Sequence, residues 1–362
     1  MRRLQFPGRD WETATPAEVG LRPGPLGELV EFAQRINSNC VAVVKDGYIV
    51  AEGYWHGFDR DTDQEIFSAS KSVTSTLVGI AADMGLLDVS QKAADFIPEW
   101  RGTPSEEVTV RDLLSNVSGR EHDFRTDYIE MAVGARDKTR FAIELGQQHE
   151  PGTVWVYNNS AIQTLEAVLE KATGRPVGLF ASEELFRPLG MTSEIATDPA
   201  GNALTFMGTR ASCGDLARFG WMAANLGRWG DRQVVSEKWM REATTPSSEL
   251  NRAYGYLWWL NADGGWVLPS GRRVEDGWFW PDAPPDAFAA LGLGGQIALV
   301  FPTEKVVVVR IGPYKSDEQV RDQGNAVNEF ARLVMESLGE KGAAHGDDSA
   351  ADAAGEEGGV GD

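Results

Sequence analysis

Two pairs of runs rich in β-branched residues, one near each end of the chain, predict two β-hairpins. The first pair covers residues 40–55 and turns at Asp46-Gly47, a dipeptide that favours the tight turn between antiparallel strands. The second pair covers residues 296–312, with the turn expected at residues 302–305. We therefore expect strands from both ends of the chain to meet in one antiparallel sheet.

Four other segments repeat apolar residues at the spacing of a helix. They are residues 72–87, 161–174, 213–227 and 325–338. Glycine follows or closes each of the first three, which is typical of a helix C-terminus. The expected buried faces are Val73, Leu77, Ile80, Ala81 and Met84 in the first segment, and Val327, Phe330, Leu333, Val334 and Leu338 in the last.

This order of elements predicts an α/β (α+β) fold in one domain, residues 1–340. We expect a sheet lobe from about residues 25–70 and 290–340, with a mostly helical lobe inserted between them. Residues 341–362 consist of glycine, alanine and acidic residues with almost nothing to bury, so they predict a disordered acidic tail. The sequence has no internal repeat.

Composition narrows the possible functions. The 362 residues are 42% hydrophobic, enough for a large core, and the formal net charge is −20. No basic face is available for phosphates, so nucleic-acid binding and anionic membrane surfaces are disfavoured. No segment approaches the roughly 18 apolar residues of a membrane span, and no signal peptide is expected behind the two N-terminal arginines. We predict a cytoplasmic protein of unspecified oligomeric state.

Two cysteines, Cys40 and Cys213, are too few for a disulfide framework, and we expect two buried thiols. No histidine-cysteine cluster has the spacing of metal ligands, so neither a metal site nor a cofactor is expected. The sequence lacks a G-x-S-x-G elbow, which argues against an α/β-hydrolase. The four histidines have no catalytic context, although a serine-histidine pair formed in space stays open.

Ser68 and Lys71 stand three residues apart at the start of the first predicted helix. On a helix this spacing puts both side chains on one face, with Ser68 at the end where backbone N–H groups are free to hold an oxyanion. A lysine packed into a core loses charge solvation, so its pKa falls and its neutral amine can accept the serine proton. A surface helix could carry the same pair by chance, so the motif alone leaves both interpretations open.

Tyr157 and Asn159 form a second motif, Y-x-N, between a Pro-Gly turn and a predicted helix. With S-x-x-K before it, this order resembles the serine β-lactamases and penicillin-binding proteins, and most of all class C β-lactamases with their esterase and amidase relatives. The likeness runs from about Trp11 to Ile311. It implies the fold of that family and acyl transfer through a serine, without a cofactor.

Family members carry a third element, K-T-G-like, at the start of the last hairpin. Here Leu293-Gly294-Gly295 takes its place, followed by Gln296. The resemblance implies that the glycines let substrate lie along the strand and that the Gln296 backbone N–H joins that of Ser68 as oxyanion donor. Leucine offers no charge to a substrate carboxylate, which weighs against penicillin recognition.

The resemblance also implies roles for the first two motifs. Ser68 attacks a carbonyl, Lys71 and Tyr157 share the role of base, and Asn159 bonds Lys71 or the acyl part of the substrate. Which of the two bases takes the proton stays open. Water then hydrolyses the acyl-enzyme.

Twelve tryptophans, several of them shortly before the third motif, favour an apolar pocket for a small ester or linear amide, although core packing accounts for part of them. Short segments such as residues 292–296 resemble 6-aminohexanoate-dimer hydrolases, and carboxylesterases share much of the pattern. Two alternatives remain: a β-lactamase or D-amino-acid peptidase, and a non-catalytic homologue that binds a ligand.

Overall fold

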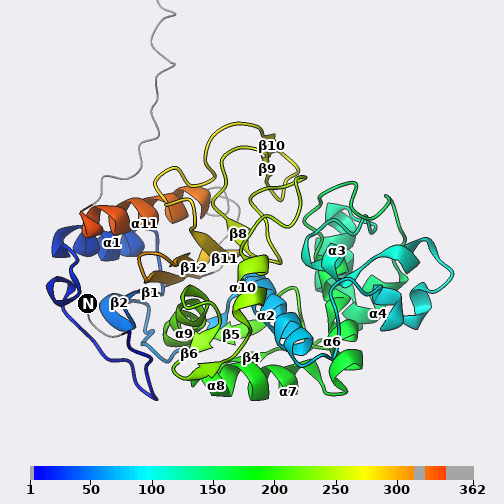
Figure 1. The fold of residues 1–362 in the computed structure, drawn as a ribbon, viewed down its shortest axis with the longest axis horizontal. Coiled ribbons are helices and arrows are strands. Elements are labelled where there is room, and N and C mark those ends of the chain that lie inside the picture. Colours follow the sequence, from blue (N-terminus) through cyan, green and yellow to red (C-terminus); the bar gives the residue numbers. More distant parts are fainter. Residues whose placement is uncertain (1–3, 314–322, 340–362) are drawn as a thin grey trace, which may run out of the picture.

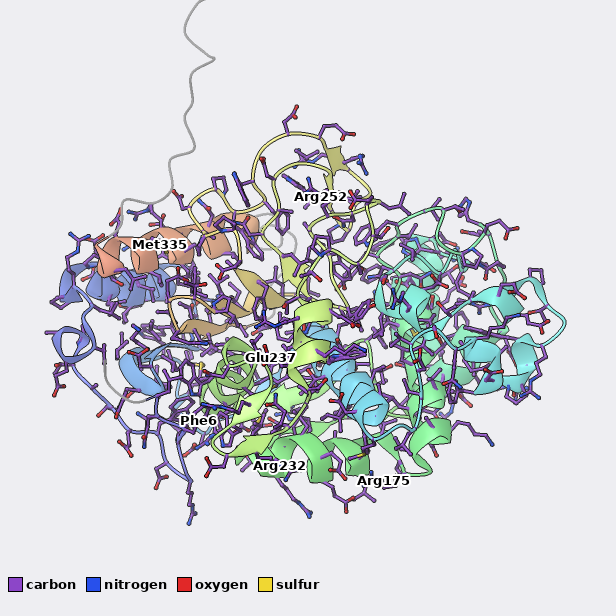
Figure 2. All side chains as sticks on the ribbon, viewed as in Figure 1. Phe6, Arg175, Arg232, Glu237, Arg252 and Met335 are labelled. Carbon is purple, nitrogen blue, oxygen red and sulfur yellow. A yellow bond between two sulfur atoms is a disulfide. The ribbon has the colours of Figure 1, made fainter. Side chains whose placement is uncertain are left out.

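The computed structural model of the chain describes residues 4–313 and 323–339. Figure 1 shows the ribbon, and Figure 2 shows the described side chains on it, with Met335 on the C-terminal helix and Glu237 near the centre. The predicted acidic tail, residues 341–362, lies outside the described residues.

A six-stranded antiparallel sheet carries one lobe, in the order β2-β1-β13-β12-β11-β8. Strand β1 pairs directly with β13, placing Cys40 opposite Ile311, so the predicted meeting of the two chain ends is confirmed. The strands are β1 (Cys40–Lys45), β2 (Tyr48–Tyr54), β8 (Trp259–Leu260), β11 (Phe288–Gly292), β12 (Gln296–Phe301) and β13 (Val306–Ile311).

Helices cover both faces of this sheet. Helices α1 (Pro23–Arg35) and α11 (Gln323–Leu338) lie side by side on one face, and α9 (Cys213–Ala224) packs against β1, β12 and β13 on the other (Figure 1). Because both faces are covered, every residue of β12 and β13 is buried. This explains why these strands are continuous apolar runs rather than alternating ones.

The second lobe is mostly helical and reaches the sheet through α2 (Ser70–Asp83). Helix α2 contacts β11, α6 and α10, so residues 70–81 are buried on every side and not on one face alone. The other helices are α3 (Val110–Leu114), α4 (Lys138–Glu144), α5 (Asn159–Gln163), α6 (Leu165–Thr173), α7 (Val177–Ala181), α8 (Arg187–Leu189) and α10 (Glu237–Ala243), with a π-helix at Arg125–Gly134.

Short strands complete the architecture. Strand β5 lies between β3 and β4 in a small sheet beside α2, and two separate pairs, β6 with β7 and β9 with β10, form two-stranded ribbons. Their bounds are β3 (Gln64–Glu65), β4 (Glu194–Ile195), β5 (Thr209–Ala211), β6 (Arg228–Trp229), β7 (Arg232–Gln233), β9 (Trp266–Val267) and β10 (Arg273–Val274).

The two cysteines correct an expectation from the sequence. Cys40 on β1 and Cys213 at the start of α9 are joined by a disulfide, with a Cα–Cα distance of 6.4 Å, so the prediction of two free thiols is wrong. The two residues stand 173 positions apart in the chain. Their proximity arises only because α9 packs on the sheet face that contains Cys40.

Candidate active site

Ser68 lies on a short 3-10 turn, η2 (Phe67–Ala69), that leads directly into α2. The preceding Phe67 has a φ of 47°, a left-handed conformation that is uncommon for a bulky residue and concentrates at functional turns. Ser68 is half-buried, whereas Ala69 behind it is fully buried. The predicted helix start is therefore a tight turn that presents the serine at the edge of the core.

Lys71 lies in the first turn of α2 and is 1% exposed. Its Nζ lies 2.9 Å from Ser68 Oγ and donates a second hydrogen bond to the Phe206 carbonyl at 2.8 Å. Burial lowers the pKa of Lys71 from 10.5 to about 7, and the nearby charge of Asp127 partly offsets that effect. Near neutral pH a large fraction of this amine is therefore unprotonated and able to accept a proton.

Tyr157 joins the pair from a different segment. Its hydroxyl is hydrogen-bonded to the Ser68 side chain, and its ring centroid lies 4.8 Å from Lys71 Nζ. Burial raises the pKa of Tyr157 well above its usual value, and the neighbouring Tyr128 and Asp127 raise it further. This phenol therefore keeps its proton across the neutral pH range, while Lys71 does not.

Asn159 begins α5, immediately after Asn158 caps that helix. Its backbone N–H donates to the buried Asp127 carboxylate at 2.9 Å, and its side chain is hydrogen-bonded to Tyr128. The Asn159 Oδ1 atom is buried without a hydrogen-bond partner among the described residues. The two hydrogen bonds of Lys71 Nζ go to Ser68 and Phe206 and not to this oxygen.

The third motif differs from the expectation. Leu293, Gly294 and Gly295 form the turn between β11 and β12, with φ angles of 80° and 75° at the two glycines. Gln296 pairs with Gly292 in the ladder, and its side chain bonds the Gly312 backbone.

Gly292, one residue before the third motif, makes the contact with the serine turn. A Cβ on Gly292 would stand 2.1 Å from the Ile66 carbonyl oxygen and 3.1 Å from the Ala69 nitrogen. Only glycine allows this approach of two backbones. The end of β11 therefore lies directly beside Ser68.

Aromatic rings pack around Tyr157. The ring of Trp259 on β8 stacks on the ring of Tyr157, with their centroids 5.9 Å apart. The ring of Phe279 in turn stacks on that of Trp259, with their centroids 5.5 Å apart. Trp155 and Tyr254 pack edge-on against Trp259. Other members of the same tryptophan-rich segments, Trp258 and Trp280, are fully buried and belong to the core.

Three residues of this arrangement were missed from the sequence. Asp127 and Tyr128 lie on the π-helix Arg125–Gly134 and hold Asn159 from behind, and the Phe206 carbonyl binds Lys71. Neither aspartate nor tyrosine here stands in a motif, and a backbone carbonyl has no sequence signature. Only the packing of these loops around α2 reveals them.

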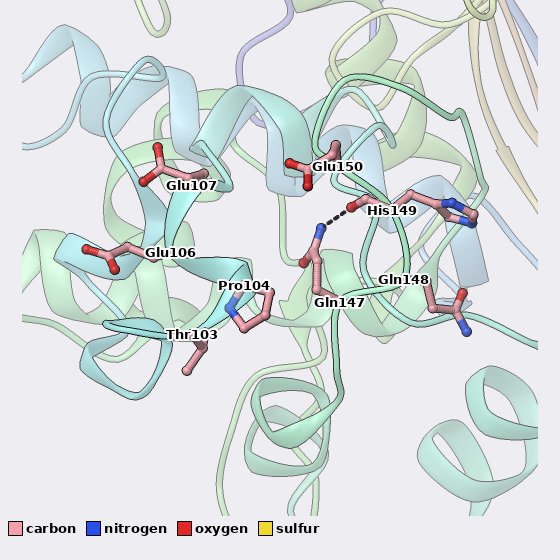
Figure 3. Close-up of a pocket in the computed structure, with 8 residues that line it drawn as sticks. All are labelled: Thr103, Pro104, Glu106, Glu107, Gln147, Gln148, His149 and Glu150. Carbon is pink, nitrogen blue, oxygen red and sulfur yellow. Dashed lines mark hydrogen bonds between the residues drawn. The ribbon is translucent and has the colours of Figure 1, made fainter.

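Three of the four histidines lie in the part of the chain that the structure describes, and their contacts are with residues other than Ser68, Lys71 and Tyr157. His56 pairs with Asn39, His122 lies 3.8 Å from Asp127, and His149 lines a cavity of about 620 Å³ that contains none of the candidate residues (Figure 3).

In the ranges 4–313 and 323–339, no group of three or more acidic, histidine or cysteine side chains is arranged to hold a metal ion. Within the same ranges, no helix has the length and apolar character required to cross a bilayer.

Comparison with known proteins identifies a family and relatives of this chain. The family model described as Beta-lactamase matches residues 26–312. The 6-aminohexanoate-dimer hydrolase of Paenarthrobacter ureafaciens is 26% identical over 305 residues, covering 75% of this chain and 77% of that protein. The D-aminopeptidase of Brucella anthropi is 29% identical over 216 residues, covering 49% of this chain and 40% of that protein.

Solved structures share the fold. A penicillin-binding protein homologue from Caulobacter crescentus superposes with a TM-score of 0.66 at 18% identity, covering 88% of this chain and 99% of its own. A family VIII carboxylesterase superposes with a TM-score of 0.63 at 18% identity, covering 90% of this chain and 99% of its own. With its fold and the extent of the family match, the chain belongs to the beta-lactamase family of serine hydrolases.

Proposed function

We propose that the protein cleaves small, uncharged esters or linear amides through an acyl-enzyme on Ser68. The observation that carries this proposal is the 2.9 Å contact between Ser68 Oγ and the Nζ of a buried lysine whose pKa is lowered to about 7. A serine becomes a useful nucleophile only beside a base that can take its proton. Lys71 has both the position and the proton affinity for that role.

The proposed reaction begins when Ser68 Oγ attacks the substrate carbonyl carbon and its proton passes to Lys71 Nζ. The bond to the leaving group then breaks as Tyr157 gives its proton to the departing alcohol or amine, and Lys71 returns a proton to Tyr157. Water attacks the acyl-enzyme with Lys71 again as base, which releases the acid and restores Ser68. The raised pKa of Tyr157 supports its assignment as proton donor rather than ground-state base.

The oxyanion is proposed to bind two backbone N–H groups, those of Ser68 and Leu293. The Gly292 carbonyl accepts a hydrogen bond from the Gly295 N–H at 3.1 Å and so faces into the turn. In a planar trans peptide the N–H points away from the carbonyl, so the Leu293 N–H faces out of the hairpin. We therefore propose Leu293 in place of Gln296, which belongs to the ladder on the other side of the turn.

The proposed substrate class follows from the walls of the site. The rings of Trp259 and Phe279 extend from Tyr157 as an apolar surface, and Leu293 contributes no charge at the turn. We also propose that Asn159 Oδ1, which is buried without a partner among the described residues, accepts a hydrogen bond from Lys71 or from the acyl part once substrate is bound. The relative named a 6-aminohexanoate-dimer hydrolase supports a linear amide as one such substrate.

Active-site labelling and a short substrate panel test the proposal. A fluorophosphonate probe should attach to Ser68, located by peptide mass spectrometry, and p-nitrophenyl butyrate and a linear aminohexanoate dimer should be hydrolysed. The Ser68→Ala variant should lose both properties. Ser75→Ala is the matched control, because Ser75 lies on α2 and its buried hydroxyl has no partner among the described residues.

The panel also includes a chromogenic cephalosporin and a D-alanine p-nitroanilide. Preferred turnover of either would replace the proposed substrate class with that of a β-lactamase or D-amino-acid peptidase. Equal behaviour of wild type and Ser68→Ala on all substrates, with no labelling, would leave the ligand-binding homologue as the better interpretation.

A further inference from the structure

Arg310 is a buried cation with no acidic partner. It lies on β13, is 4% exposed, and no described carboxylate forms an ion pair with it. Burying a charge without a counter-ion is costly unless hydrogen bonds replace the lost water. The hydrogen-bond partners of this guanidinium therefore indicate its role in the structure.

Those partners are backbone oxygens of the turn beside Ser68. Arg310 Nη1 donates to the Gly294 carbonyl at 2.5 Å and to the Gly295 carbonyl at 2.7 Å. Its other nitrogens donate to Ser38 Oγ and the Ile36 carbonyl, which belong to the segment before β1. The guanidinium thus links the turn after β11 to the segment that precedes β1, at the same end of the sheet.

A side chain on either of the two glycines closest to the guanidinium would displace it. A Cβ on Gly295 would stand 2.3 Å from Arg310 Nη1, and one on Gly312 would stand 2.3 Å from Nη2. The planar group fills the space that side chains would otherwise take. The glycines of the third motif thus leave room for the arginine beneath the turn as well as for a substrate along the strand.

Gln296 holds the remaining carbonyl of the turn. Its Nε2 donates to the Leu293 carbonyl at 3.1 Å and to the Gly312 carbonyl at 2.8 Å, while its Oε1 accepts from the Gly312 N–H at 3.0 Å. Gln64, four residues before Ser68, donates to the same Gly312 carbonyl at 2.8 Å. The amide is fully buried, so each of these bonds is protected from water.

Every carbonyl from residue 292 to residue 295 is therefore bonded within the protein. Gly292 bonds the Gly295 N–H, Leu293 bonds Gln296, and Gly294 and Gly295 bond Arg310. Since a peptide unit is planar, fixing its carbonyl also fixes the direction of its N–H. Held in this way, the turn cannot flip a carbonyl toward the reacting oxygen.

We infer that Arg310 and Gln296 are positioning residues for the reaction, holding the 292–295 turn so that the Leu293 N–H stays directed at the substrate oxyanion. This inference rests on the proposed acyl-enzyme mechanism. Neither side chain touches the substrate. Both act through the turn, so their loss should weaken binding of the transition state and leave binding of the ground-state substrate nearly unchanged.

The experiment compares Arg310→Met with Arg218→Met in the full-length protein. Arg218 is the matched control: it is 3% exposed and also donates to backbone carbonyls, those of Leu189 and Arg9, but it bonds no residue of the turn. The acylation rate with p-nitrophenyl butyrate is measured by stopped flow on correctly folded protein. Affinity for butylboronic acid, which forms a tetrahedral adduct on a serine, is measured alongside.

In Arg310→Met we expect acylation to slow about 100-fold and boronate affinity to fall by a similar factor. The substrate dissociation constant, obtained from the concentration dependence of the acylation rate, should change less than about twofold. Arg218→Met should keep the wild-type values. Arg310→Lys should fall between, because one ammonium can still reach a carbonyl. Gln296→Glu provides a second route if Arg310→Met does not fold, since a carboxylate cannot donate to the Leu293 carbonyl.

A readout independent of catalysis is amide hydrogen exchange of the peptide that spans residues 288–301. Exchange there should accelerate in Arg310→Met and stay unchanged in Arg218→Met. Equal loss of rate in both variants, or unchanged exchange and rate in Arg310→Met, overturns the inference. If wild type itself forms no acyl-enzyme while exchange responds as expected, the proposed function fails and Arg310 supports the turn for a structural purpose only.

Discussion

At the scale of the residue, the site is organised by one difference in proton affinity. Lys71 and Tyr157 both contact Ser68, and both are buried. Burial disfavours the charged form of each, which lowers the pKa of the amine and raises that of the phenol. The same environment thus produces a neutral base and a neutral acid on the two sides of one serine.

We predict that kcat/KM for an ester rises with pH and reaches half its plateau near pH 7. The base form of Lys71 is the neutral amine, and a pKa of about 7 means that it is protonated and inactive below that pH and free above it. Initial rates between pH 5 and 9 check this. Lys71→Arg should lose at least about 100-fold at every pH, because a guanidinium stays protonated. A wild-type rate that still rises tenfold per pH unit between pH 8 and 9 contradicts the assignment.

Asp127→Asn should move this acid limb toward lower pH. The Asp127 carboxylate raises the pKa of Lys71, so removing its charge makes the amine easier to deprotonate. We expect a shift of up to about one pH unit, with a loss of stability of about 1–3 kcal/mol from the bonds to the Asn159 and Ser160 N–H groups. His122→Gln, beside the same carboxylate, is the control; a shift toward higher pH would argue against the electrostatic explanation.

At the scale of the element, the catalytic geometry depends on how closely η2 and β11 approach each other. The serine turn and the strand come from positions more than 200 residues apart, and Gly292 is where their backbones meet. Helix α2 carries Lys71 behind the turn and is itself enclosed by β11, α6 and α10. A small displacement between these elements changes the distance on which proton transfer depends.

Gly292→Ala should therefore lower kcat/KM by about 100-fold or more, because the added Cβ forces the strand away from the Ile66 carbonyl. The comparison is Gly27→Ala on α1, where a Cβ meets nothing within 4 Å. That change should keep full activity and raise stability by about 0.5–1 kcal/mol. Steady-state kinetics and thermal melts check both; near-normal activity of Gly292→Ala would show that the close approach does not matter for the reaction.

At the scale of the whole molecule, the two ends of the chain form one sheet, and a disulfide fastens that sheet to α9. The loop closed by Cys40 and Cys213 contains nearly half of the chain, including Ser68 and Tyr157. Closing so long a loop restricts the unfolded chain more than the folded one. Disulfides are also uncommon in reducing compartments, so this bond weighs against the cytoplasmic location expected from the sequence.

We predict that native protein purified without reductant has no titratable thiol and releases two after denaturation with reductant. Replacing both Cys40 and Cys213 with alanine should lower stability by about 2–4 kcal/mol, which for a chain of this length corresponds to a fall in Tm of about 3–5 °C. Thiol titration and calorimetry measure both quantities. Two titratable thiols in the native, air-exposed protein would instead support the expectation from the sequence that both cysteines are free.

Several elements were predictable because their signals are local. The Asp46-Gly47 turn, the valine-rich strands and the spacing of apolar residues in α11 each lie within a short window. Ser68, Lys71 and Tyr157 stand in short motifs, so the sequence was enough to nominate them as candidates. Asp127, Tyr128 and the Phe206 carbonyl stand in none, and they became visible only as neighbours of α2 and α5.

The sequence by itself determined the elements, the meeting of both chain ends and the chemical groups available for acyl transfer, because periodicity and side-chain type act over a few residues. The tertiary structure alone decided the Cys40–Cys213 bond, the contact of Gly292 with the serine turn, and the proton affinity of Lys71. Each of these depends on distance and burial between segments remote in sequence. Packing of the folded chain creates this proximity, and no short window of the sequence reveals it.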